Sequence, residues 1–235
     1  MSAMVNQLSP LYDKKVLCIF CKRTFNTKRV RSSFIRIKRI ESDFCKVYKE
    51  KTMNPLFYEA DVCPACGFTS TEAFSQGFPN GTKEEIAKQF IKWKSQDFGK
   101  ERTVSEAIKA LKLAILSAVL KKESSVVTGG IYLRLAWVYR SIKNYNEERR
   151  FLLAAFSHYK LSYESGDYIG TQMTEMRLLY LLGELARRLE KNDDAGLYFT
   201  SVIQHKKIAT EERIVEMARE QWFVMRNQKQ VNPAK

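Results

Sequence analysis

The sequence predicts an α+β protein: a small antiparallel β module of the zinc-ribbon kind, followed by an all-α, tetratricopeptide-like helical array. Two Cys-x-x-Cys pairs with 41 residues between them place four thiolates in the N-terminal third. Alternating apolar and polar residues surround these pairs, whereas apolar residues recur at helical spacing from residue 82 onward. We therefore expect four parts, which are a lead-in at 1–12, a zinc-ribbon-like module at 13–75, a helical domain at 82–228 and a tail at 229–235.

Length and composition are those of a globular protein outside the membrane. The chain has 235 residues, of which 45% are apolar, so it can bury the core of one large or two small domains. The longest apolar-rich run, residues 111–120, is too short to span a bilayer. Residues 1–10 lack the pattern of a secretory signal. With four of five cysteines in Cys-x-x-Cys pairs, we expect metal binding in a reducing cytoplasm rather than disulfides.

The β module is predicted from three short patterns. Residues 16–25 read as strand, metal turn and strand, and Ile35 and Ile37 alternate with basic residues in a half-buried strand at 33–40. Tyr58, Ala60 and Val62 alternate in a strand that ends at the second cysteine pair. Such a module buries little apolar area, so a bound metal is expected to complete its stability.

The two cysteine pairs predict one closed metal site. Zinc prefers four tetrahedral ligands, and each Cys-x-x-Cys turn brings two sulfurs to one ion. The second turn contains Pro64, which fixes φ, and ends at Gly67, which can adopt a left-handed conformation. Iron fits the same shell, whereas a redox dithiol lacks the expected βαβ context. Because four sulfurs leave no open position, we expect a structural site. Its ligands are Cys18, Cys21, Cys63 and Cys66.

The remaining cysteine and the two histidines are not expected to be ligands. Cys45 can supply an exchangeable fifth ligand, but a small buried side chain is the commoner role for a lone cysteine. His158 and His205 lie on predicted helices, far along the sequence from the cysteine pairs. We expect them to be packed or surface residues.

The second half of the chain is predicted to be entirely helical. Thr82 with Glu85, and Thr103 with Glu106, have the form of capping boxes. An apolar stripe at 107–118 predicts a helix. Further helical patterns run over residues 126–142, 146–163, 171–190, 193–205 and 210–226.

Two of the predicted helix pairs resemble tetratricopeptide repeats. The matching positions are offset by 47 residues, whereas the standard repeat is about 34. The alternative is a generic helical bundle, because stripes of Leu, Ala and Tyr are first of all core. The matches are Tyr132, Leu135, Ala136, Tyr139, Leu152, Ala155 and Phe156 in the first pair, and Leu182, Gly183, Ala186, Ala195, Phe199 and Val202 in the second.

Tetratricopeptide proteins bind partners in the concave groove lined by the first helix of each pair. Arginines among aromatic residues suit an extended acidic peptide or a terminal carboxylate, so the predicted partner is a protein or acidic peptide. The alternative for the two aromatic residues is packing against neighbouring helices. The predicted groove residues are Arg134, Trp137, Arg140, Arg177, Tyr180, Arg187 and Arg188.

The positive charge of the chain indicates nucleic-acid binding as the alternative function. The net charge is +14, and residues 22–39 contain eight basic side chains and no acidic one. A four-thiolate zinc centre carries −2, so part of this excess can neutralise the site. Ile35 and Ile37 are assigned to the core, and no recognition motif appears, so a solvated face or a partner surface is the default. The residues of the alternative are Lys28, Arg29, Arg31, Arg36, Lys38 and Arg39, with Phe25, Phe34 and Phe44 interleaved.

No sequence pattern indicates an enzyme or a small-molecule substrate. The chain has two histidines and lacks a phosphate-binding glycine loop, a Gly-x-Ser-x-Gly elbow and a His-Glu-x-x-His motif. We therefore predict a non-catalytic, zinc-binding adaptor, with nucleic-acid binding as the alternative.

Several linked features of the sequence carry a family resemblance: the two cysteine pairs, the helical tail, Asp43-Phe44-Cys45 with Tyr48, and Asn54-Pro55-Leu56 with Tyr58. Through these features, nearly the whole chain resembles a bacterial family known as domain of unknown function 2225. The resemblance implies a cytoplasmic protein, mostly of spore-forming or related bacteria, with no assigned activity. The first cysteine pair lacks the Pro and Gly of the second, which departs from an ideal ribbon.

Overall fold

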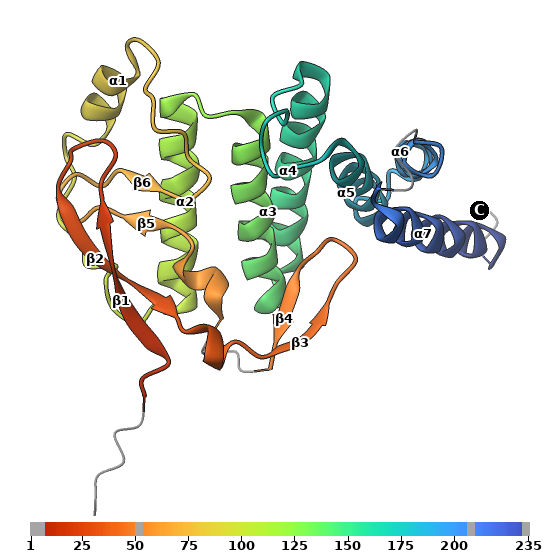
Figure 1. Cartoon of the computed structure of the whole chain (residues 1–235), viewed down its shortest axis with the longest axis horizontal. Helices are drawn as coiled ribbons and strands as arrows, with labels where there is room; N and C mark the ends of the chain where they lie inside the picture. The colour runs from red at the N-terminus through yellow and green to blue at the C-terminus, as the bar shows by residue number, and fades with distance from the viewer. Residues whose placement is uncertain (1–7, 50–53, 206–209, 232–235) are drawn as a thin grey trace, which may run out of the picture. The chain divides into compact units, whose positions relative to one another are not determined.

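The structure is a computed structural model that describes residues 8–49, 54–205 and 210–231. Its contacts divide the chain into two compact units. The cysteine unit comprises Met1–Ile40 and Lys46–Glu123, and the helical unit comprises Glu41–Cys45 and Ser124–Lys235. The predicted α+β class is confirmed, because short antiparallel strand pairs precede seven helices in the described chain (Figure 1).

The strands of the cysteine unit form three separate two-stranded antiparallel sheets. The longest pairs β1 (Leu11–Leu17) with β2 (Thr24–Val30), in register from Leu11 opposite Val30 to Leu17 opposite Thr24. The others pair β3 (Ile37–Ile40) with β4 (Lys46–Tyr48) and β5 (Asp61–Val62) with β6 (Thr69–Ser70). Two 3₁₀ turns, η1 (Ser32–Phe34) and η3 (Pro55–Tyr58), lie between them.

Two predicted strands are shorter than expected, and one has no buried face. The stretch 33–40 begins in η1, and β3 is exposed along its whole length, with Ile37 at 42% and Ile40 at 52% exposure. The expected core role of Ile37 is therefore wrong, because alternation shows only that a strand has two faces. Tyr58 ends η3 rather than starting a strand, since Asn54 accepts a hydrogen bond from the Leu56 amide and starts a 3₁₀ turn.

Two helices complete the cysteine unit, α1 (Thr82–Gln89) and α2 (Val104–Lys121). The capping box of Thr103 and Glu106 is confirmed at the start of α2. The one expected at Thr82 is wrong, because Gly81 is the N-cap in a left-handed conformation (φ 78°) and the Thr82 hydroxyl donates to the Pro79 carbonyl. The buried side of α2 packs on η3, β5 and β6. This packing places the unit boundary at residue 123, inside the predicted helical range 82–228.

Buried Arg102 ties several segments of the cysteine unit together. Its guanidinium donates to the carbonyls of Phe57 and Ala60 at 3.0 and 2.8 Å, and to that of Phe98 at 3.0 Å. It also reaches the Thr27 hydroxyl on β2. Burial lowers the pKa of Arg102 to about 10, which leaves the side chain charged at neutral pH. A single cation thus satisfies several carbonyls near the strand that leads to the second cysteine pair.

The helical unit contains α3 (Ser125–Ser141), α4 (Tyr145–Ser165), α5 (Glu175–Arg188), α6 (Asn192–Ile203) and α7 (Glu212–Val231). These bounds confirm the predicted helices to within a few residues. α3 packs on α4, α5 packs on α6, and α7 contacts both α5 and α6. No strand occurs after residue 82 among the residues described. Over the whole described part of the chain, no helix is long and apolar enough to cross a bilayer.

The positions that match the repeat pattern are almost all buried. The close approach of α5 and α6 occurs at Gly183, where an added Cβ would lie 2.8 Å from the ring of Phe199. Phe199 itself is fully buried. Glu148 on α4 is also buried and accepts a hydrogen bond from Arg140 at 2.7 Å.

We expect Gly183→Ala to lower the free energy of unfolding by about 1–3 kcal/mol, because the added methyl overlaps Phe199. The measurement is urea unfolding of the full chain followed by circular dichroism. Gly196→Ala on α6 is the matched control, since no atom lies within 4 Å of its added Cβ and alanine favours a helix by about 1 kcal/mol. Equal effects of the two substitutions would show that the predicted close contact does not limit the packing.

Candidate functional site

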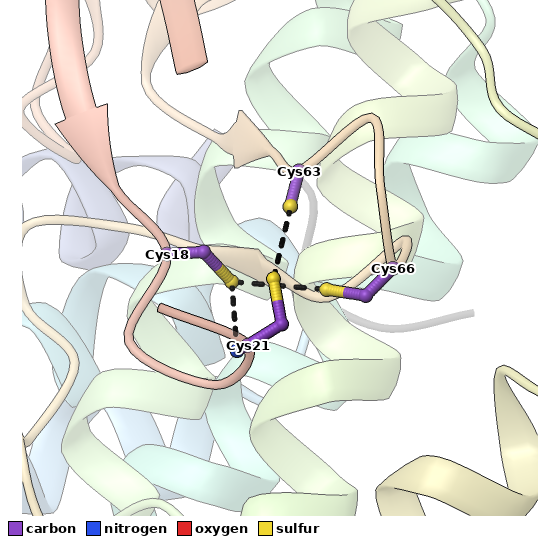
Figure 2. A group of neighbouring side chains, drawn as sticks. All are labelled: Cys18, Cys21, Cys63 and Cys66. Atoms are coloured by element: carbon purple, nitrogen blue, oxygen red, sulfur yellow. Dashed lines mark hydrogen bonds between the residues drawn. The ribbon is translucent and has the colours of Figure 1, made fainter. Parts of the chain in front are cut away.

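The four predicted metal ligands converge on one point in the cysteine unit. Their Sγ atoms all lie within 4.8 Å of one another, with 3.7 Å between Cys18 and Cys66 and 3.6 Å between Cys21 and Cys63 (Figure 2). Zinc–sulfur bonds of about 2.3 Å in a tetrahedron place sulfurs about 3.8 Å apart. The group therefore fits a tetrahedral metal with four thiolate ligands.

The two cysteine turns have the same backbone design. The amide of Lys22 donates to the Cys18 carbonyl at 3.0 Å, as that of Gly67 does to the Cys63 carbonyl at 2.9 Å. Lys22 adopts φ 61° and Gly67 φ 76°, so the left-handed residue needed in the second turn also occurs in the first. The strain at Lys22 is about 1–2 kcal/mol. The missing glycine of the first pair therefore does not prevent the turn, and the Cys21 amide donates to the Cys18 sulfur.

Aromatic residues pack over the second turn, which the sequence analysis missed. The Trp93 indole donates to the Pro64 carbonyl at 2.9 Å. A Cβ on Gly67 would lie 2.5 Å from Trp93 and 2.7 Å from Phe90. Gly67 is thus required both for its backbone conformation and for the close approach of these rings. A tryptophan shortly after a helix gave no signal of this role.

The charge state of the sulfurs favours a cation at their centre. Donation of a hydrogen bond to Cys63 raises the pKa of Cys18 to about 12, and the pKa of Cys66 is also raised by its hydrogen bonds to Cys18 and Cys63. The hydrogen bonds that Cys63 accepts from Cys18 and Cys66 lower its pKa to about 2. Several thiolates so close together repel one another, and a divalent metal removes that repulsion while displacing protons.

The other cysteine and the histidines lie elsewhere. Cys45 is buried in the helical unit, where desolvation raises its pKa to about 12. The His158 ring stacks on Tyr132 with centroids 5.1 Å apart, and burial lowers its pKa. His205 lies 3.4 Å from a carboxylate oxygen of Glu175. The cysteine cluster, which is the candidate metal site among the described residues, contains none of the three.

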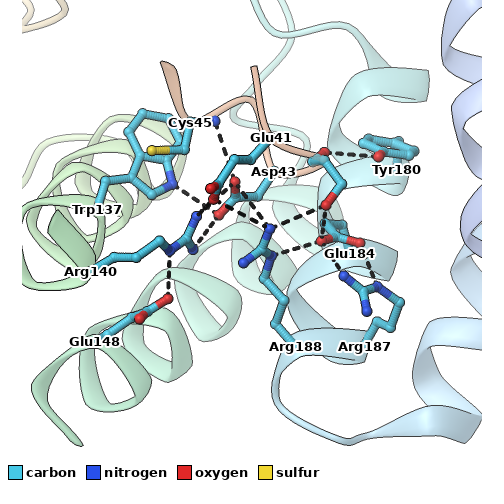
Figure 3. A network of polar contacts seen from close by, with 11 residues as sticks. Glu41, Asp43, Cys45, Trp137, Arg140, Glu148, Tyr180, Glu184, Arg187 and Arg188 are labelled. Atoms are coloured by element: carbon cyan, nitrogen blue, oxygen red, sulfur yellow. Dashed lines mark hydrogen bonds and ion pairs between the residues drawn. The ribbon is translucent and has the colours of Figure 1, made fainter. Parts of the chain in front are cut away.

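Most of the predicted groove residues surround the chain's own segment Glu41–Cys45, which we call the acidic segment (Figure 3). Arg140 contacts both carboxylates of the segment, with 2.6 Å to Asp43. The Trp137 indole donates to Asp43 at 3.0 Å, and the Tyr180 hydroxyl donates to the Ser42 carbonyl at 2.8 Å. Arg188 donates to the Ser42 hydroxyl and lies 3.6 Å from Asp43.

The contacts around the acidic segment pair opposite charges and are largely buried. Asp43 has no exposed surface. Burial alone raises its pKa, but the hydrogen bond from Arg140 and the charge of Arg188 outweigh that effect and hold the pKa below its ordinary value. Asp43 therefore stays ionised at neutral pH, as a buried carboxylate between guanidinium groups should.

Two predicted groove residues lie outside this cluster. Arg134 donates to the Gly130 carbonyl of its own helix at 3.0 Å. Arg177 lies 3.6 Å from Glu211, and its side chain is largely exposed. Arg187 belongs to the cluster indirectly, because it forms two 2.8 Å hydrogen bonds to Glu184 rather than to the acidic segment.

The acidic members of the cluster were missed by the sequence analysis. They are Glu41 and Asp43 in the segment and Glu148 and Glu184 on the helices. A usable signal exists for the first two, since they are the only acidic residues between positions 14 and 49. An isolated acidic pair in a basic stretch indicates a specific cationic partner.

The basic residues of the alternative function differ in their contacts. Arg29 is paired with Asp61 at 2.9 Å and is largely buried, and Lys28 is paired with Asp13. Arg31 lies over the Tyr12 ring. Arg36, Lys38 and Arg39 are exposed on and before β3. The sequence of the cysteine unit carries +12 of the net charge of +14. Phe44, one of the interleaved aromatics, instead packs against Tyr180 in the helical unit.

Comparison with known proteins gives one match. A family model described as "Uncharacterized protein conserved in bacteria (DUF2225)" matches residues 11–225. No curated protein and no solved structure matches the chain.

We expect the purified protein to contain one zinc ion per chain, and Cys63→Ala to lose it. Structural zinc contributes about 10 kcal/mol or more to folding in small zinc domains, so the cysteine unit should unfold at a lower temperature. Metal analysis and thermal unfolding measure both effects. Cys45→Ala, which also removes a buried thiol, is the matched control and should keep its zinc. Full zinc content in Cys63→Ala would contradict the four-sulfur site.

We expect Gly67→Ala to release zinc to a colorimetric chelator several-fold faster than the wild type. The left-handed backbone and the overlap with Trp93 and Phe90 together should cost about 2–4 kcal/mol. Gly77→Ala is the control, because nothing lies within 4 Å of its added Cβ. Identical release rates for the two variants would show that the aromatic packing does not support the turn.

Proposed function

Because the chain belongs to the DUF2225 family of bacterial proteins, whose description names no reaction, we propose its function from its own residues. The protein is a non-catalytic metal-binding adaptor of the cytoplasm. Zinc at the four cysteines holds the cysteine unit folded, and the tetratricopeptide-like helical unit binds a protein partner through an acidic segment. Iron is the alternative metal for the same sulfurs.

The donor set supports a structural rather than a catalytic metal. Four thiolates fill a tetrahedral shell, whereas catalytic zinc keeps one position for water or substrate. A structural role also agrees with the two-stranded sheets of the cysteine unit, because a sheet of two strands is only marginally stable by itself. The five free cysteines support a reducing compartment, and thus the cytoplasm.

The adaptor function rests on one observation, which is that the helical unit already holds an acidic segment. Arg140, Arg188, Trp137 and Tyr180, four of the predicted groove residues, make these contacts. A surface that binds two carboxylates and a backbone carbonyl has the chemistry needed for an acidic peptide. The Gly183–Phe199 contact supports the repeat-like packing that forms such a groove.

Charge favours nucleic-acid binding as the second candidate. The cysteine unit carries nearly all the net positive charge, and Arg36, Lys38 and Arg39 are exposed. Binding by phosphate contacts would be independent of the groove and would weaken steeply with salt.

One binding experiment on the full chain separates the two candidates. The probe is a fluorescent peptide with the sequence of residues 37–48, and its neutral version carries Gln for Glu41 and Asn for Asp43. We expect the wild type to bind the probe and not the neutral version. Arg188→Gln should weaken binding at least ten-fold, because it removes charge-assisted hydrogen bonds of about 1.5–3 kcal/mol each.

The controls test the site and the competing function. Arg219→Gln, an exposed change on α7, should bind like the wild type. Added RNA or duplex DNA should leave probe binding unchanged. The adaptor proposal is wrong if neither the wild type nor any variant binds the probe. If instead labelled RNA or DNA binds with a steep salt dependence and Arg36→Glu with Lys38→Glu abolishes that binding, the nucleic-acid function replaces it.

A further inference from the structure

The acidic segment is bound by contacts that an unlinked peptide could make equally well. Its two carboxylates meet Arg140, and Arg188 lies close to both. The Ser42 carbonyl accepts from Tyr180, and the Phe44 ring packs against the same tyrosine with centroids 5.4 Å apart. The ligand is therefore defined by two carboxylates two residues apart, followed by an aromatic side chain.

The arginines of the groove have a second partner on the helices. Arg140 donates to Glu148 at 2.7 Å, and Arg188 donates to Glu184 at 2.7 Å. Glu184 is fully buried and is also held by Arg187. If the acidic segment left, neither guanidinium would become an unpaired buried charge, which is the main cost of breaking a buried ion pair. The groove is thus organised without its occupant.

The strand that precedes the acidic segment depends little on core packing. All four residues of β3 are exposed, including Ile37 and Ile40. The hairpin of β3 and β4 has a register irregularity between Ile37 and Arg39, and the Lys49 amide bonds to the Arg36 carbonyl at its open end. The segment itself forms a tight turn with Phe44 at φ 66°, closed by the Glu41 amide and the Cys45 carbonyl. Because β3 contributes no buried residue, this turn depends on its contacts with the groove to stay folded and in place.

We propose that the acidic segment is an exchangeable occupant of the helical groove, and that a protein partner binds by presenting a similar acidic turn and displacing it. This inference rests on the proposed adaptor function and adds its regulation and the motif of the partner. The tethered segment competes at a high effective concentration, so the free protein binds such partners weakly. Any change that weakens the segment's own contacts increases the fraction of molecules whose groove is free. The apparent affinity for the partner rises in proportion to that fraction.

The test uses the full chain and the fluorescent probe with the sequence of residues 37–48. The double variant Glu41→Gln with Asp43→Asn weakens the acidic segment and leaves every groove residue intact. We expect this variant to bind the probe at least ten-fold more tightly than the wild type in fluorescence anisotropy. The matched control is Glu216→Gln with Glu220→Gln, which removes two exposed carboxylates from α7 and should leave the affinity unchanged.

A second measurement does not depend on the variant's folding. In uniformly ¹⁵N-labelled wild type, saturating unlabelled probe should displace the acidic segment. The amide protons of residues 41–45 should then exchange with solvent at least ten-fold faster, while those of α5 keep their protection. The neutral version of the probe should cause neither change.

The outcomes separate this inference from the adaptor function. Equal affinities of wild type and double variant, or a bound probe that leaves residues 41–45 protected, would overturn the displacement proposal while the groove remains a peptide site. Absence of probe binding in both proteins would overturn the adaptor function together with it. Tighter binding by the double variant with loss of protection in the wild type supports both.

Discussion

The convergence of four sulfur atoms is the constraint on which the cysteine unit depends. Sheets of two strands are marginal in water, and the described residues of the cysteine unit form three of them without a larger sheet to join them. The sulfurs come from turns that follow β1 and β5, so a metal bound between them would fix these strands relative to each other. Arg102 and α2 also contact this arrangement, through η3 and the residues that lead into β5.

The four-cysteine cluster and the helices could be predicted from the sequence because both depend on local spacing. A Cys-x-x-Cys turn needs only its own residues, and the helix of Thr103 and Glu106 carries its own start signal. The surroundings of the site could not be predicted in the same way. Trp93 reaches Pro64 across 29 residues, and Lys22 adopts a left-handed conformation that its type does not announce. Alternation at β3 was misleading, because period two says nothing about which element, if any, covers a strand.

The groove illustrates the limit of reasoning from residue type. Arginines and aromatic residues at first-helix positions indicated acidic ligands, and five of the seven form one cluster with carboxylates. The pattern could not show that the chain supplies the acidic ligand itself, since Asp43 and Arg140 are 97 positions apart. The boundary of the helical unit was unpredictable for a similar reason. A stripe of alanine and leucine on α2 fits a repeat helix and a sheet-covering helix equally well.

The chain passes between its two units three times, because residues 41–45 belong to the helical unit while the residues on both sides belong to the cysteine unit. This order has a consequence for synthesis on the ribosome. Asp43 leaves the exit tunnel 97 residues before Arg140, which at typical elongation rates is about 5–20 seconds. During that interval Cys63 and Cys66 have already emerged and can close the sulfur cluster. The cysteine cluster can therefore form while the acidic segment is still exposed to solvent, because the helices that contact this segment, α3 and α5, have not yet been synthesised.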